Sequence, residues 1–278
     1  MKYRFLLSSL LLALSTPAWA AGGAGSEEPA QPGDQIQLAM TMYAGGISFG
    51  KMDMDTTLRG GDYHSVSNFQ TSGVVNAFWQ SEIQATSSGR IGAKALQPGL
   101  YDSFDINRTG KKQEVSLTYD NGAPKLYADP VYSTTGFEAK PEDQKDTLDP
   151  LSAATFIISG LSANPGDPCS LSTRIFDGRR LYRIEMTKVK DTDIKMDNGL
   201  YAGKAALCQV KYRALGGMRP RVLRINENFP VINAWVVSFP GAAGHTFSVP
   251  VRLWADTQYG QLSVVADAMK IDGQPPKP

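Results

Sequence analysis

One short segment has the spacing of a hydrolase nucleophile, because Gly46-Ile47-Ser48-Phe49-Gly50 follows the pattern Gly-x-Ser-x-Gly. In that motif the serine stands on a sharp turn between a strand and a helix, which holds its hydroxyl toward the substrate. Here Ile47 and Phe49 alternate with polar or small residues, as in a strand, and no helical pattern follows. We therefore expect Ser48 to lie in a bending strand and not to act as a nucleophile.

Few other residues are arranged for acid–base or metal chemistry. The two histidines, His64 and His245, lie far apart, with no carboxylate or cysteine at ligand spacing. Three aspartates resemble part of a calcium loop: Asp191, Asp193 and Asp197. However, Lys195 and Met196 stand where an EF-hand has an oxygen ligand and glycine. The sequence thus predicts no enzyme, no metal site and no cofactor, although a histidine brought beside a serine or carboxylate by folding would favour an enzyme.

Two cysteines, Cys169 and Cys208, are the only ones in the chain. In an exported protein two cysteines usually pair, and a metal or catalytic role would require Cys-x-x-Cys spacing or a nearby histidine. The predicted disulfide closes a loop of about 40 residues, which the chain-entropy model values at roughly 4 kcal/mol. We expect a structural disulfide.

Two groups of arginines flank predicted turns, Arg174, Arg179, Arg180 and Arg183 in the first and Arg213, Arg219, Arg221 and Arg224 in the second. If the strands that carry them are neighbours, their guanidinium groups share one side and can hold phosphate or carboxylate groups of lipid or peptidoglycan. The alternative is an ordinary solvated face that pairs with acids and protects sheet edges. Arg179, Arg180 and Arg183 are our candidate ligand-binding residues in this group.

A second set of candidates is apolar: Met40, Met42, Met52, Met54 and Trp235. The methionines line one face if their strands pair, and methionine adapts to irregular apolar ligands. We expect these side chains on the concave face of a sheet, where they either contact a ligand or simply fill the core.

The elements that must position these residues are mainly strands. Apolar residues recur at every second position in most segments, as at 36–42 and 182–186, and Asp177-Gly178 marks the clearest hairpin turn. Asp149 and Pro150 are good first residues for a helix over about 150–161. The sequence therefore predicts an all-β fold, a strongly curved antiparallel sheet or open barrel, with one short helix that plugs or covers an opening.

The chain divides into four predicted parts. Residues 1–20 have the charged start, short apolar run and Ala-x-Ala end of a signal peptide, and the run is shorter than the roughly 20 residues that span a bilayer. Residues 21–33 are typical of a disordered leader. A single domain is expected over 34–272, with two sets of strands joined by an exposed connection at 125–148, and 273–278 form a tail. No transmembrane segment is expected in the mature chain.

The nearly neutral net charge excludes partners that are bound mainly by long-range electrostatic attraction. Removal of Lys2 and Arg4 with the signal peptide leaves 26 basic residues against 27 acidic ones, a net charge of −1. Such a chain has no bulk attraction for nucleic acid or for an anionic membrane.

Several motifs, taken in order, resemble the bacterial family known as domain of unknown function 3108. They are Tyr43-Ala44-Gly45-Gly46-Ile47-Ser48-Phe49-Gly50, Pro98-Gly99 with Tyr101-Asp102-Ser103-Phe104, Asp149-Pro150-Leu151-Ser152, Asp177-Gly178 and Pro250-Val251-Arg252. The resemblance covers roughly 35–268. It implies an envelope protein with a curved antiparallel sheet, and it brings no catalytic residues.

These observations lead to two functional hypotheses. The first is a non-enzymatic periplasmic protein that binds an apolar or amphipathic envelope component, a lipid or the acyl chain of a lipoprotein, inside the curved sheet. The alternative is a structural or interaction protein that supports envelope integrity through contacts with proteins or peptidoglycan. In that case the hairpins flanked by arginines form the surface that contacts the partner.

Overall fold

The computed structural model describes residues 33–73, 80–93, 95–107, 110–132, 136–161, 164, 166–226, 229–258 and 260–276. The signal peptide and nearly all of the leader that we expect at the N-terminus lie outside these residues, as do the last two residues of the tail. All described residues belong to one compact unit, Gln31–Pro278.

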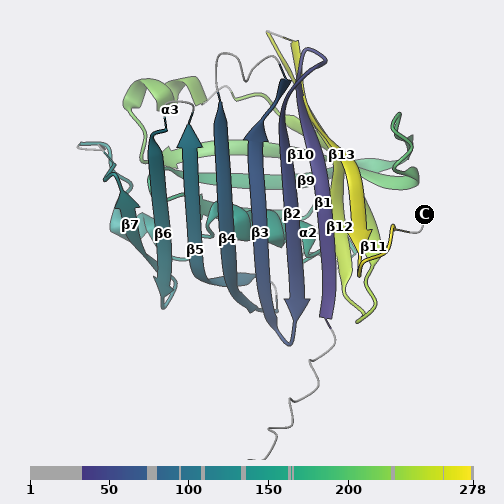
Figure 1. Cartoon of the computed structure of the whole chain (residues 1–278), viewed down its shortest axis with the longest axis horizontal. Helices are drawn as coiled ribbons and strands as arrows, with labels where there is room; N and C mark the ends of the chain where they lie inside the picture. The colour runs from purple at the N-terminus through teal and green to yellow at the C-terminus, as the bar shows by residue number, and fades with distance from the viewer. Residues whose placement is uncertain are drawn as a thin grey trace, which may run out of the picture. The chain divides into compact units, whose positions relative to one another are not determined.

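Thirteen strands and three short helices make up the described chain (Figure 1). The strands of the first half are β1 (Gly33–Ala44), β2 (Ile47–Arg59), β3 (Asp62–Thr71), β4 (Ser81–Ile91), β5 (Leu96–Asn107), β6 (Lys112–Asp120) and β7 (Ala123–Asp129). Helices α1 (Pro141–Gln144) and α2 (Pro150–Ile158) follow. The second half contains β8 (Leu171–Phe176), β9 (Leu181–Lys195), β10 (Ala202–Gly216), α3 (Pro220–Asn226), β11 (Ile232–Pro240), β12 (Thr246–Thr257) and β13 (Gly260–Ile271).

The strands form one antiparallel sheet in the order β7-β6-β5-β4-β3-β2-β1-β13-β12-β11-β10-β9-β8. The chain starts in the middle of the sheet and runs outward through hairpins to β7. It then crosses to β8 at the opposite edge and returns through hairpins until β13 pairs with β1. The all-β prediction is confirmed. The segment between β7 and β8, which carries α1 and α2, connects the two edges.

The sheet curves around α2. This helix contacts β3, β4 and β5 from the first half of the sheet and β8 and β12 from the second half. Figure 1 shows β9 and β10 crossing behind the first strands at a steep angle, with α2 in the same region. At one end the two edges approach each other, since a Cβ on Gly178 in the β8–β9 turn would lie 2.8 Å from Val115 of β6 and 2.9 Å from Leu126 of β7.

The predicted helix is confirmed as α2, but it ends at Ile158 and not at 161, and the described chain contains two further short helices, α1 and α3, that the sequence did not predict. The ends of α2 have local causes. Asp149 accepts a hydrogen bond from the Ser152 backbone N–H at 2.7 Å, and Pro150 is the first helical residue. The helix stops at Ile158, shortly before Gly160, whose φ is +69°. Gly160 also permits close packing, because a Cβ there would lie 2.3 Å from the Thr246 carbonyl oxygen of β12.

The connection that we predict at 125–148 is partly a strand, because β7 occupies its first residues. The polar composition of this connection is typical of a loop, as is Pro124 directly before it. Both are tolerated in β7, an edge strand that pairs on one side only. Further along, Leu148 pairs in parallel with Ile175 of β8. The Leu148 N–H donates to the backbone oxygen of Arg174, and the Leu148 carbonyl oxygen accepts from the Phe176 N–H, both at 2.9 Å. The connection therefore covers part of the free edge of β8.

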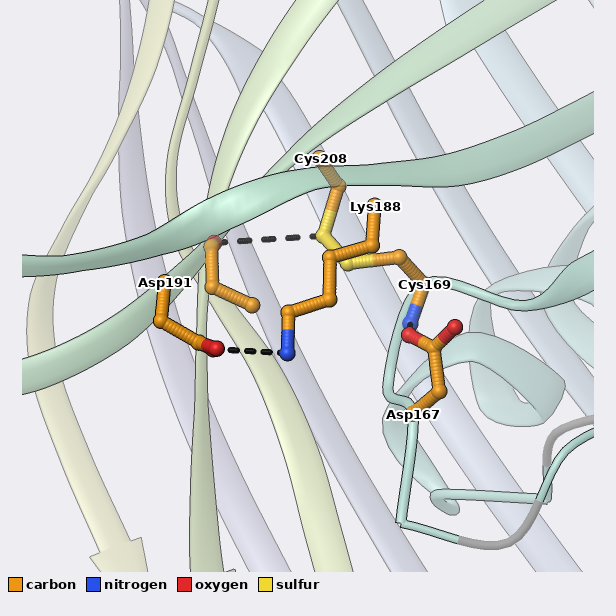
Figure 2. Close-up of a disulfide and its surroundings, with 6 residues drawn as sticks. Asp167, Cys169, Lys188, Asp191 and Cys208 are labelled. Atoms are coloured by element: carbon orange, nitrogen blue, oxygen red, sulfur yellow. Dashed lines mark hydrogen bonds and ion pairs between the residues drawn. A yellow bond between two sulfur atoms is a disulfide. The ribbon is translucent and has the colours of Figure 1, made fainter.

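The predicted disulfide joins Cys169 to Cys208, with 5.7 Å between their Cα atoms. Both cysteines are completely buried, and Figure 2 shows the bond beside β10. The Cys169 N–H donates to Asp167 at 2.9 Å, which helps to hold the segment before β8. Since β9 lies between β8 and β10, the bond ties the segment just before the edge strand β8 to β10, two places further into the sheet.

We expect the double variant Cys169→Ala, Cys208→Ala to lose about 2–5 kcal/mol of unfolding free energy, because the unfolded chain regains the freedom of a long loop. Urea unfolding under oxidising conditions measures this change. Wild type treated with a reductant in its folded state is the control, and it should stay oxidised since both sulfurs are buried. A loss below about 0.5 kcal/mol would show that the bond does not hold the edge.

Candidate ligand-binding site

A pocket of about 950 Å³ opens where the connection between the two edges passes the ends of several strands. Its walls come from the β4–β5 turn, the β6–β7 turn, residues 146–148, α2, β8 and β9. The residues that line it are Gly89, Arg90, Ala95, Leu96, Gln97, Pro98, Gly99, Tyr119, Asn121, Gly122, Asp146, Thr147, Leu148, Phe156, Ser172, Thr173, Arg174 and Arg183. We call this space the edge pocket.

The lining of the edge pocket includes three large apolar side chains that are nearly buried. Leu96 is 4% exposed, Leu148 7% and Phe156 6%, and all three belong to the hydrophobic core. They come from β5, the edge connection and α2, so the pocket depends on the contact between the helix and both halves of the sheet. A concave site with apolar walls and a few polar groups is the usual form of a small-molecule site.

Arginines supply the positive charge of this pocket. Arg174 of β8 and Arg183 of β9 stand directly opposite each other in the strand register, and Arg90 extends from the end of β4. The Arg174 guanidinium donates to the backbone oxygen of Lys145 at 2.6 Å and of Asp143 at 3.4 Å. Among the described residues that line the pocket, Asp146 is the single carboxylate beside three arginines, so these residues carry excess positive charge.

Behind this pocket, α2 meets the concave face of the sheet through hydroxyl groups. Thr155 hydrogen-bonds to Ser65 at 2.6 Å, and Ser152 hydrogen-bonds to Tyr63 and to Ser87, each at 2.7 Å. All five side chains are buried. Buried polar groups are stable when each has a partner, and small hydroxyl side chains allow the helix to approach the sheet closely.

Asp149 is the charged member of this network and is fully buried. Its carboxylate accepts from the Ser152 N–H and hydroxyl and from the Ser87 hydroxyl, the last at 3.2 Å. Burial raises its pKa from 3.8 to about 6, and the hydrogen bonds from Ser152 and Ser87 oppose part of that rise. The carboxyl group therefore titrates in a mildly acidic range.

Tyr119 connects the network with the edge pocket. It lines the pocket, and its buried hydroxyl has no hydrogen-bond partner among the described residues. Burial raises its pKa strongly, and the negative charge of Asp149 adds to that rise. A buried hydroxyl without a partner is costly, so this group is available to a polar atom of a bound molecule.

The predicted methionines lie on the concave side of the sheet. Met40 and Met54 are buried in the core, with Met52 packed against it, and Met42 is half-buried. Met40 stands opposite Met52 in the register, as expected for paired strands. Met54, two residues before Thr56, shares a face with the hydroxyl residues that meet α2. None of the four lines the edge pocket.

Trp235 does not share a face with the methionines. It stands opposite Arg252 of β12, which stands opposite Val265 of β13. Met40 stands opposite Ala266, and neighbouring residues of a strand point to opposite faces. Trp235 therefore lies on the reverse face, where the Arg252 guanidinium carbon lies 5.3 Å from its ring centroid and 5.4 Å from that of Trp254.

The predicted arginines separate into two groups. Arg183 lines the edge pocket, while Arg179 and Arg180 lie at the exposed tip of the β8–β9 hairpin. Arg180 is bound to Asp177 through a 2.7 Å ion pair, and Arg179 lies over the ring of Tyr132 at 5.8 Å. These two side chains stabilise the hairpin turn and do not contribute to the pocket.

The remaining candidates for chemistry are dispersed. His64 is exposed on β3, and the His245 ring hydrogen-bonds to the backbone oxygen of Ser159. Ser48 lies in β2, as expected, and a register shift close to it marks a β-bulge. Among the residues that the structure describes, no three His, Cys, Asp or Glu side chains form a group that could hold a metal ion.

Sequence reasoning missed most of the edge pocket. Leu96, Tyr119 and Phe156 come from separate elements and carry no shared motif. Arg174 belongs to the first arginine group, but its role as partner of Arg183 depends on strand register. A usable signal was Asp149-Pro150, which places a helix between the two sets of strands.

The raised pKa of Asp149 makes the stability of the folded protein depend on pH. Between its ordinary pKa of 3.8 and about 6, the folded state holds a proton that the unfolded state has lost. This group therefore contributes most stability below pH 4 and loses that contribution as pH rises through 6, by at most about 3 kcal/mol.

Asparagine at this position keeps an acceptor for the helix N-terminus but does not titrate. We expect wild type to gain stability relative to Asp149→Asn as pH falls from 7 to 4, measured by urea unfolding at several pH values. The unfolding free energy of wild type minus that of Asp149→Asn should thus rise on acidification. If this quantity is independent of pH, or falls on acidification, the assignment is contradicted.

Of three comparisons with known proteins, the match to a family model identifies the family. No curated protein matches the chain. A solved structure that it resembles is a β-barrel-like protein of domain of unknown function DUF1849 from Brucella abortus, with 13% sequence identity and a TM-score of 0.46 over 87% of this chain and 98% of the other. The family model "Protein of unknown function (DUF3108)" matches residues 39–267. The family that the sequence motifs indicated is thereby confirmed, and the chain belongs to the DUF3108 family.

Proposed function

We propose that this chain is an exported, non-enzymatic protein of the bacterial periplasm that binds an apolar or amphipathic envelope component. The component is a lipid or the acyl chain of a lipoprotein. The observation that carries this proposal is the edge pocket, which combines about 950 Å³ of space with the apolar side chains Leu96, Leu148 and Phe156. Pockets of about 300–1,000 Å³ are typical of sites for small organic molecules. The lining of the edge pocket mixes apolar residues with polar and charged ones, which suits an amphipathic molecule.

Two observations support export. The first residues have the charge, apolar run and small residues of a cleavable signal. The buried disulfide is typical of proteins that fold in an oxidising compartment. In the described part of the chain, no helix is long and apolar enough to cross a bilayer.

The surroundings of the pocket support binding without turnover. The described residues of its lining include neither histidine nor cysteine, and the one carboxylate among them, Asp146, is exposed. The buried Asp149 is held by three hydrogen bonds from Ser87 and Ser152 at the start of α2, where it stabilises the helix. We therefore assign Asp149 a structural role beside the site.

A variant that fills the pocket tests the proposal. Ser172 lines the pocket and is exposed, so Ser172→Trp adds a large ring there without removing a core contact. We expect this variant to bind a fluorescent fatty acid at least about tenfold more weakly than wild type, a loss of about 1.4 kcal/mol. The matched control is Thr187→Trp, which changes an exposed residue of β9 outside the pocket.

Displacement titrations on the purified mature protein measure these affinities, and mass spectrometry of the native protein detects co-purified lipid. The expected result is equal affinity for wild type and Thr187→Trp and an affinity at least about tenfold lower for Ser172→Trp. Absence of binding in wild type, or equal binding by both tryptophan variants, would remove the edge pocket as the site.

A further inference from the structure

Three arginines form one row across the second half of the sheet. Arg174 of β8 stands opposite Arg183 of β9, and Arg183 stands opposite Arg213 of β10. Directly opposite residues of an antiparallel pair lie on the same face with their Cβ atoms roughly 4.5–5.5 Å apart. Like charges in this arrangement repel each other, so the row is unfavourable unless an anion lies near it.

The neighbouring acids do not neutralise the row. Glu185, two residues along β9, pairs with Arg183 at 3.6 Å, and both side chains are 38% exposed. Such an exposed pair contributes little. In the described part of the chain, Arg174 and Arg213 form no ion pair with a carboxylate. Lys211 stands opposite Glu185 and adds a further positive charge.

Arg174 is held in place by groups that do not cancel its charge. Its two terminal nitrogens donate to the backbone oxygens of Lys145 and Asp143, which lie in the connection that forms one wall of the pocket. These bonds fix the direction of the guanidinium group and leave some of its five N–H donors unused. Arg183 lines the same pocket from the next strand.

The charged and apolar parts of the edge pocket face one space. Arg174 and Arg183 line it together with Leu148 and Phe156. Arg213, the third arginine of the row, does not line it. A molecule with an oxyanion at one end and an apolar chain at the other satisfies both parts of the lining, since guanidinium groups bind phosphate and carboxylate with paired hydrogen bonds.

We propose that the edge pocket selects an anionic amphiphile, whose phosphate or carboxylate head binds between Arg174 and Arg183 while its chain lies against Leu148 and Phe156. This inference rests on the proposed function and adds the class of ligand. A neutral lipid of the same chain length occupies the apolar part of the pocket, but it leaves the positive charges of Arg174 and Arg183 without an anion.

Three ligands with the same acyl chain test the selection: a fatty acid, a lysophosphatidic acid and an uncharged monoacylglycerol. Inorganic phosphate is the fourth probe and separates a lipid head from a free anion. Displacement titrations at pH 7.5 should show that the two anionic lipids bind at least about tenfold more tightly than the neutral one. Inorganic phosphate should compete only at far higher concentration.

Substitutions assign the selection to particular side chains. Arg183→Gln should remove most of the tenfold preference for the anionic lipids over monoacylglycerol, while Arg183→Lys should retain part of it. Arg213→Gln is the matched control, because it removes the same charge from the same row outside the pocket. Far-UV circular dichroism and thermal unfolding of each variant verify the fold.

The outcomes separate the two proposals. Equal binding of anionic and neutral lipids overturns the anionic selection and leaves the proposed function standing, whereas no binding of any lipid overturns both. If Arg183→Gln and Arg213→Gln lose the preference for anionic lipid equally, the preference is an effect of bulk charge, and its assignment to the arginines of the pocket is overturned. Tight binding of inorganic phosphate alone, with no gain from an acyl chain, shows a free-anion site and also overturns it.

Discussion

The contact between α2 and the concave face of the sheet is the interaction on which the positions of the pocket residues depend. Paired hydroxyls such as Ser65 with Thr155 and Tyr63 with Ser152 join the two elements where larger apolar side chains would hold them apart. Because α2 touches strands of both halves, it fixes how the halves curve toward each other. Phe156 and the segment before Asp149 then become walls of the edge pocket.

This arrangement has an electrostatic cost. Asp149 begins the helix and is fully buried, and no cation of the described residues forms an ion pair with it. Its burial therefore raises its pKa, while three hydrogen bonds stabilise the charged form. The same region holds the Tyr119 hydroxyl, which has no hydrogen-bond partner in the part of the chain that the structure describes. A purely apolar core would avoid both costs, but it would also remove polar groups from the neighbourhood of the pocket.

Topology explains why a pocket forms at this place. The two edges of the sheet, β7 and β8, are consecutive strands in the chain, and the segment that joins them must pass the concave side. Residues 147–149 bind along β8, since Leu148 pairs with Ile175 there, and the helix then turns into the curve. The ends of β4, β5 and β6 complete the walls. The disulfide further restrains β8, on which Arg174 lies.

The amino-acid sequence alone was sufficient for features with local or pairwise causes. Period-two alternation predicted the strands, Asp149-Pro150 predicted the helix, and two cysteines predicted the disulfide. Only the tertiary structure decided the register that places Arg174 opposite Arg183, the opposite faces of Trp235 and Met40, and the meeting of Leu96 with Phe156. The physical reason is that a one-residue change of register reverses the face of every side chain, and register between distant strands depends on the packing of the whole sheet.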